Sequence, residues 1–115
     1  MRFLLLLRGD AAAEAAMTDD DRRAMVQDHI AYSAMLRQRG AYVYGDALDR
    51  PETARVVQFD GPEAVVTDGP FLESKESLGG FYVIQCDSAD AAADLARQLP
   101  RSPGLVAELR PIPEV

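Results

Sequence analysis

The chain has 115 residues, a length that suits one domain over residues 1–115 with a single small core. Acidic residues outnumber basic ones by 19 to 12, and the basic residues are scattered, so the formal charge of −7 disfavours nucleic acid or an anionic membrane as partner. The single cysteine, Cys86, and the single histidine, His29, are too few for a structural metal site, and their usage fits a cytoplasmic protein without metal or cofactor.

The chain opens with a short apolar run over residues 3–7, which is closed by Arg8-Gly9-Asp10. The run is shorter than the apolar part of a signal peptide, and no later stretch is long enough to span a bilayer. We therefore expect a buried strand here. Residues 11–16 are ambiguous and are compatible with a helical turn.

A long amphipathic helix and a second strand follow. Thr18 and the three aspartates after it are typical of a helix N-terminus, where carboxylates face the positive end of the helix dipole. The apolar spacing predicts a helix to about Arg39, with Gly40 as the residue that ends it. The second strand is expected over residues 41–48, irregular at Gly45.

The second half of the chain predicts four more strands and an alanine-rich helix. The strands are expected over residues 54–59, 64–67, 81–86 and 105–109, the first two as a hairpin. A loop is expected from residue 68 to about residue 78, and the helix over residues 89–99 with Pro100 after it. Pro111 and Pro113 are expected to end the last strand.

This order is β-α-β-β-α-β with an extra β-hairpin, and it predicts an α+β, ferredoxin-like fold. In that fold both helices cover one face of an antiparallel sheet. The other face is left bare, with Tyr42, Tyr44 and Tyr82 among the candidates to line it. Because a bare sheet face on a globular domain usually has a partner, we expect a homodimer with two sheets packed face to face.

The segment over residues 66–82 carries three elements in order: Asp68-Gly69-Pro70-Phe71, Glu73-Ser74-Lys75-Glu76 and Leu78-Gly79-Gly80-Phe81. It resembles the signature of the DGPF-motif branch of the YCII-related family. The extended string carries the resemblance, since Asp60-Gly61-Pro62 repeats its first part in an ordinary hairpin turn. The resemblance implies a dimeric α/β barrel of uncertain function, often linked to sigma factors of the extracytoplasmic-function class.

His29 and Asp68 are the candidate catalytic residues. The resemblance places His29 where a relative branch has a histidine proposed to work with an aspartate of the second helix. That aspartate has no counterpart in Leu99-Pro100-Arg101, so Asp68 is taken as a substitute. The alternatives are a hydrogen-bonded core histidine and an aspartate that only shapes a turn.

The candidate ligand-binding residues lie on the motif loop and the strand after it. They are Phe71, Lys75, Glu76, Gly79, Gly80 and Tyr82. Charged residues of both signs and paired glycines suit a pocket mouth that a ligand approaches closely. Exposed ion pairs, a β-bulge and ordinary packing explain the same residues without a ligand.

Three functions remain open from the sequence. The first is a regulatory dimer that binds a small molecule or a protein partner, such as a sigma factor. The second is an enzyme of the isomerase, lyase or monooxygenase-like kind that uses His29 and Asp68 as acid and base. The third is a structural dimer without a ligand. No nucleotide-binding, serine-hydrolase or zinc signature is present.

Overall fold

The structure is a computed structural model that describes residues 1–70 and 76–115, apart from the side chain of Glu76. Its strands are β1 (Arg2–Asp10), β2 (Tyr42–Ala47), β3 (Arg55–Asp60), β4 (Glu63–Asp68), β5 (Glu76–Gln85) and β6 (Val106–Ile112). Its helices are α1 (Ala11–Ala15), α2 (Asp19–Gln38) and α3 (Ala89–Ala96), with a 3₁₀ turn, η1 (Pro51–Thr53), before the hairpin.

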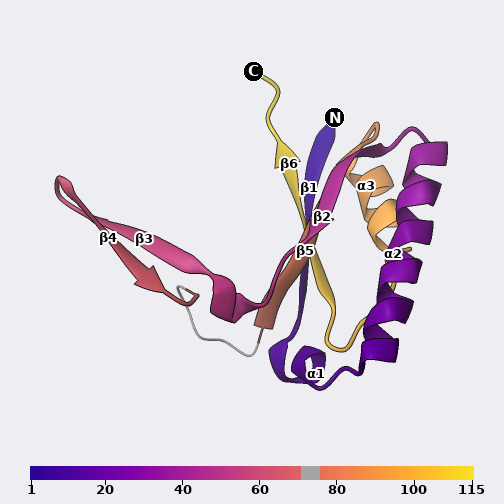
Figure 1. Ribbon diagram of the computed structural model, residues 1–115. Coiled ribbons are helices and arrows are strands. Elements are labelled where there is room, and N and C mark those ends of the chain that lie inside the picture. Colours follow the sequence, from indigo (N-terminus) through magenta and orange to yellow (C-terminus); the bar gives the residue numbers. More distant parts are fainter. Residues whose placement is uncertain (71–75) are drawn as a thin grey trace.

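Four strands form one antiparallel sheet in the order β2-β5-β1-β6 (Figure 1). The first strand lies inside the sheet and pairs with β5 and β6, while α2 and α3 lie together on one side. Within the described residues, β3 and β4 pair with each other as a separate two-stranded sheet and with no other strand. The fold class is therefore α+β, as the sequence predicts.

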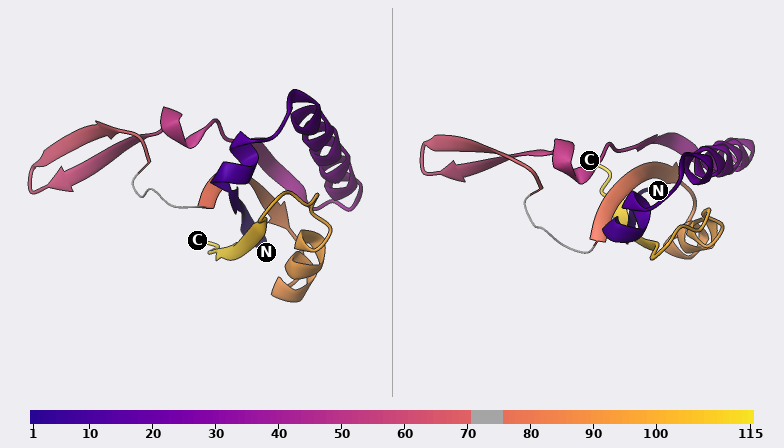
Figure 2. Two further views of the ribbon diagram at one scale, coloured as in Figure 1. Left: turned by 90° about the horizontal axis from the view of Figure 1, so that it is seen from below. Right: turned by 60° about the horizontal axis from the view of Figure 1, so that its bottom comes forward.

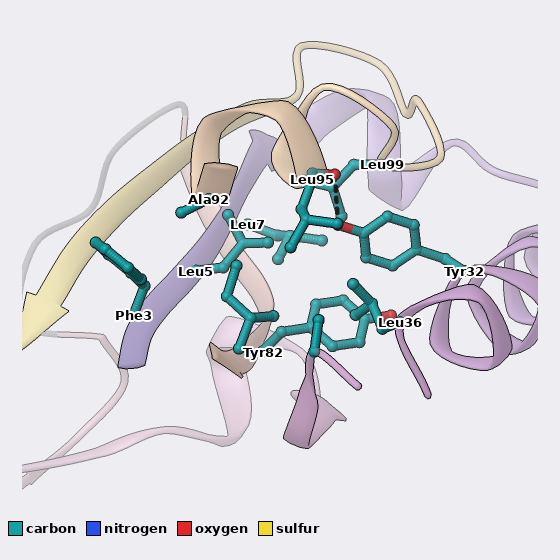
Figure 3. Close-up of a cluster of buried hydrophobic side chains, with 11 residues drawn as sticks. Phe3, Leu5, Leu7, Tyr32, Leu36, Tyr82, Ala92, Leu95 and Leu99 are labelled. Carbon is teal, nitrogen blue, oxygen red and sulfur yellow. Dashed lines mark hydrogen bonds between the residues drawn. The ribbon is translucent and has the colours of Figure 1, made fainter. Parts of the chain in front are cut away.

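The core lies between the sheet and the two helices. Alternate residues of β1 (Phe3, Leu5 and Leu7) point toward the helices, and α2 contributes Tyr32 and Leu36 (Figure 3). Leu5 and Leu36 are fully buried. The period of two in β1 thus fixes which face of the sheet receives the helices.

The expected helix signals act as predicted in α2. The Thr18 side chain accepts a hydrogen bond from the Asp21 backbone N–H, and the Asp21 carboxylate accepts one from the Thr18 N–H. Gly40 follows the helix with a φ of 68°, a left-handed conformation that glycine adopts without strain. The capping box and Gly40 therefore set both ends of this helix.

Four expected element boundaries are wrong. β1 continues through Arg8, Gly9 and Asp10 instead of ending at Leu7, because these residues pair with the start of β5. β5 begins at Glu76 instead of near residue 81, because its first residues pair with the end of β1. β6 continues through Pro111, since it is an edge strand and the missing proline N–H breaks no ladder. α3 ends at Ala96 instead of residue 99, because the following hydrogen bonds span three residues and form tighter turns.

The irregularity expected at Gly45 is also misplaced. The register of β2 against β5 shifts between Tyr42 and Tyr44. Gly45 instead lies against Tyr82, where an added Cβ would stand 2.5 Å from a ring carbon. Its lack of a side chain therefore serves a close approach.

The tyrosines expected on the bare face divide between the two faces of the sheet. Tyr82 is only 6% exposed and packs on the helix side, and Tyr42 pairs with Ile84 on that side as well. Tyr44 pairs with Val83 on the opposite side. Only one of the three thus lines the bare face.

We call the bare side the open face; its apolar centre is Leu4, Leu6, Tyr44, Phe81 and Val83. The β3–β4 hairpin extends from this side of the sheet, away from α2 and α3 (Figure 2). The molecule accordingly has a radius of gyration of 16.0 Å, against roughly 13 Å for a compact chain of this length.

Candidate functional site

A cavity of about 420 Å³ lies between α2 and the end of the sheet where β1 meets α1. Its apolar wall on the helix side consists of Leu7, Met25, Val26, Ile30, Ala47 and Leu105, and Phe81, whose ring packs beside Tyr44 on the open face, also borders the cavity. Its polar and charged residues are Arg8, Glu14, His29, Ser33, Arg37, Asp46, Tyr82 and Ser102. An apolar cavity with a few polar groups at this volume is typical of a site for a small organic molecule.

His29 and Tyr82 meet in the wall of this cavity. The Nδ1 atom of His29 and the hydroxyl oxygen of Tyr82 share a hydrogen bond of 2.7 Å. The two rings are stacked, with centroids 6.0 Å apart and planes inclined by 20°. α2 supplies the imidazole and β5 supplies the phenol, so the pair forms only when the helix is docked on the sheet.

Burial keeps both members of this pair neutral near pH 7. It lowers the pKa of His29 below its ordinary 6.5, and the nearby Asp28 carboxylate opposes this only in part. Burial also raises the pKa of Tyr82 above 10.0, and the nearby Ser33 hydroxyl opposes this in part. The site therefore presents an uncharged imidazole bonded to an uncharged phenol.

Tyr32 supports Tyr82 from behind. Its ring meets the Tyr82 ring edge-on at a centroid distance of 5.3 Å, and its hydroxyl donates a 2.7 Å hydrogen bond to the Leu95 carbonyl oxygen. Burial raises the pKa of Tyr32 to about 12. Tyr32 thereby connects the site to α3 and limits the movement of the Tyr82 ring.

The glycines of β5 bring neighbouring strands close to the cavity. The β1–β5 register shifts between Leu7 and Arg8, and Gly79 is the extra residue of this β-bulge. At Gly80, an added Cβ would lie 2.9 Å from the backbone oxygen of Asp46. Both glycines line the cavity.

Four residues predicted for the site come together at the cavity: His29, Gly79, Gly80 and Tyr82. Phe71 and Lys75 lie outside the described residues, as does the side chain of Glu76.

Asp68 stands apart from His29 within the chain. It ends β4 on the projecting hairpin, its side chain is 92% exposed, and its carboxylate lies 3.7 Å from the Nε atom of Arg55. It does not line the cavity. β4 pairs with β3 in the projecting hairpin, which places the strand that Asp68 ends away from α2 (Figure 1).

Several cavity residues were missed by the sequence analysis. Ser33 and Arg37 lie four and eight residues after His29 on α2, so helical spacing alone could have placed them on the His29 face. The Arg37 guanidinium also lies over the Tyr42 ring, 4.2 Å from its centroid. Glu14 had no such signal, because the five-residue helix that carries it has no apolar period to read.

The described residues contain no cluster of three or more His, Cys, Asp or Glu side chains able to hold a metal ion. Among the helices in residues 1–70 and 76–115, none has the length and apolar character needed to cross a membrane.

Comparison with known proteins places the chain in a family. The sequence matches the YCII-related domain over residues 1–114. It is also similar to a protein of Rhizobium meliloti (strain 1021), described as "Uncharacterized protein R00369", with 31% identity over 99 residues. The aligned region covers 86% of this chain and 80% of that relative. The chain therefore belongs to the family of YCII-related domains.

Proposed function

We propose that this YCII-related domain binds a small organic molecule in the cavity at His29 and Tyr82. The observation that carries the proposal is a neutral imidazole, hydrogen-bonded to a neutral phenol, in the wall of an apolar cavity of about 420 Å³. Buried polar groups of this kind fix the orientation of a ligand whose body fills the apolar space.

The direction of the hydrogen bonds indicates which ligand group is recognised. In this proposal the Tyr82 hydroxyl donates to Nδ1 of His29, which is one of the two directions that the bond can take between a neutral phenol and a neutral imidazole. A neutral imidazole that accepts at Nδ1 carries its hydrogen on Nε2. The ligand should therefore offer an acceptor, such as a carbonyl or carboxylate oxygen, on an apolar body.

Ligand binding is tested with a panel of small aromatic and aliphatic carboxylic acids, ketones and matching hydrocarbons, read by thermal shift. A ligand that binds only the native state raises the melting temperature. Compounds with an acceptor oxygen should raise it in the wild type and lose most of this effect in His29→Gln and Tyr82→Phe. Tyr44→Phe, which changes a tyrosine outside the cavity, is the matched control. Equal shifts in the His29→Gln variant and the wild type would contradict the proposal.

An enzyme is the second candidate, favoured by the same hydrogen bond. An imidazole and a phenol within 2.7 Å form an acid–base pair that can exchange a proton with a bound substrate. In this form Tyr82 takes the place first considered for Asp68. Turnover of a bound compound by an isomerase, lyase or monooxygenase-like reaction, lost in both variants above, would support the enzyme over the binding module.

We propose the oligomeric state of the domain from its open face and its regulatory role from the resemblance to the DGPF-motif branch. The apolar centre of the open face supports a homodimer in which two sheets pack together, as in a dimeric α/β barrel. The extended motif over residues 66–82 supports membership of the DGPF branch, and with it a regulatory role beside a cytoplasmic sigma factor. Light scattering at micromolar concentration tests the dimer, and co-purification with a purified sigma factor tests the association.

A further inference from the structure

The β3–β4 hairpin, here called the arm, has an apolar side that the described part of the chain leaves uncovered. Paired residues of an antiparallel ladder share a face, so Val57 and Val66 lie beside Phe59 and Ala64 on one side of the arm. Phe59 is 79% exposed, Val66 59% and Val57 49%. We call these four residues the arm face. A two-stranded hairpin with such a surface is marginal in water by itself, so another surface is needed to stabilise it.

The charges at the tip of the arm also indicate that another surface is needed to stabilise it. Asp60 and Glu63 stand directly opposite each other in the ladder, and like charges at such positions destabilise a hairpin. The open face carries cations near one end. Arg110 is paired with Leu4 and bonds the Glu108 carboxylate on the same face at 2.7 Å, and Arg2 lies two residues before Leu4. An acidic tip and basic residues on the open side are therefore two complementary surfaces of one chain.

The direction of the arm selects the occupant. The arm leaves the subunit on the side of the open face, so a molecule packed on that face lies beside the arm (Figures 1 and 2). A second copy of this chain offers both an apolar face and arginines to the arm. Two-fold symmetry would then let each subunit use the same pair of surfaces once.

We infer that the arm clasps a second copy of this chain, with the arm face packed against the other subunit and the acidic tip beside its arginines. This inference rests on the proposed homodimer and is independent of the proposed ligand. The arm adds an interface beyond the contact between the two open faces.

The test measures dimer dissociation of the full chain by sedimentation equilibrium. In the arm-face variant V57T/F59T/V66T, threonine removes apolar surface from the arm face, and it is itself a residue that strands favour. We expect its dimer dissociation constant to rise by about 100-fold or more, because the centre of an interface dominates affinity. The matched variant V56T/V65T changes the other side of the same hairpin and should stay within about 3-fold of the wild type.

Amide hydrogen exchange gives a second measurement that does not depend on a variant. In the wild type, protection of the arm amides should rise as protein concentration crosses the dissociation constant. Unchanged dimerisation of the arm-face variant, equal weakening by both variants, or concentration-independent exchange of the arm would each overturn the inference. A monomeric wild type at about 100 µM would overturn both this inference and the homodimer. Binding of the carboxylic acid panel is measured separately by thermal shift. Failure of the ligand proposal can therefore be told apart from failure of this inference.

Discussion

The Nδ1 atom of His29 lies 2.7 Å from the hydroxyl oxygen of Tyr82, although the two residues are 53 positions apart in the sequence. The contact joins the middle of α2 to the middle of β5, across the layer where the helix packs on the sheet. Any change in that packing should therefore alter the chemistry of the site before it unfolds the domain.

The first prediction concerns the protonation of His29. Because burial disfavours the imidazolium, its pKa should lie below 6.5 in the native protein. The chemical shift of the ring proton on Cε1, followed by NMR as a function of pH, measures this directly, since His29 is the only histidine. Tyr82→Phe removes the phenolic partner of His29, so the midpoint of the His29 titration should differ from that of the wild type. A midpoint at or above 6.5 in the wild type would contradict the burial argument.

The second prediction follows from the first by linkage. When the folded pKa of a base lies below its unfolded value, the unfolded chain binds the proton first as the pH falls. The free energy of unfolding should therefore be intact above the unfolded pKa of 6.5 and decline as the pH falls toward the folded pKa. Urea unfolding at several values between about pH 7.5 and about pH 5.5 checks this. His29→Gln cannot titrate, so its stability should decline less over this window; identical slopes would refute the assignment.

The main elements of the fold could be predicted from local signals in the sequence. The capping box at Thr18 and the left-handed Gly40 define α2 without reference to the rest of the chain. The start of β5 could not be predicted this way, because it depends on pairing with the end of β1, a contact between distant segments. Pro111 reads as a strand end in the sequence and is tolerated in β6 only because that strand lies at the sheet edge.

The site could be predicted only in part. His29 and Tyr82 were both candidates, but their contact depends on the side of the sheet that Tyr82 faces, which the sequence did not determine. Asp68 lies close in sequence to the motif glycines, yet the ladder between β3 and β4 holds it on the arm. Closeness in sequence to the motif glycines therefore did not predict whether Asp68 lies at the cavity, because Asp68 belongs to a projecting hairpin.

The third prediction concerns the support that Tyr32 gives to the site. Tyr32→Phe removes the hydroxyl donor from the Leu95 carbonyl oxygen, which still accepts from the Gln98 backbone N–H, so the free energy of unfolding should fall by the contribution of one hydrogen bond, about 0.5–1.5 kcal/mol. Tyr44→Phe removes the same atom from a side chain that is 52% exposed and should change stability by less than about 0.5 kcal/mol. Denaturant unfolding of both variants measures the difference. Equal effects would show that the Tyr32 hydroxyl is not specifically important.

The last prediction tests whether the close approach at Gly45 shapes the site. A Cβ at this position would lie 2.5 Å from Cδ1 of Tyr82 and 3.1 Å from the Phe81 carbonyl oxygen, so Gly45→Ala must displace a ring that is almost fully buried. Overpacking of this kind costs about 1–3 kcal/mol. At Gly79 the nearest atoms stand at 3.7 Å and 3.9 Å, so Gly79→Ala should be accommodated with ordinary contacts. Denaturant unfolding gives the two stabilities, and the NMR titration of His29 reports the site. If Gly45→Ala displaces Tyr82, the His29 midpoint should change in that variant and stay near the wild-type value in Gly79→Ala, whereas matching titrations in both would separate the glycine from the chemistry of the pair.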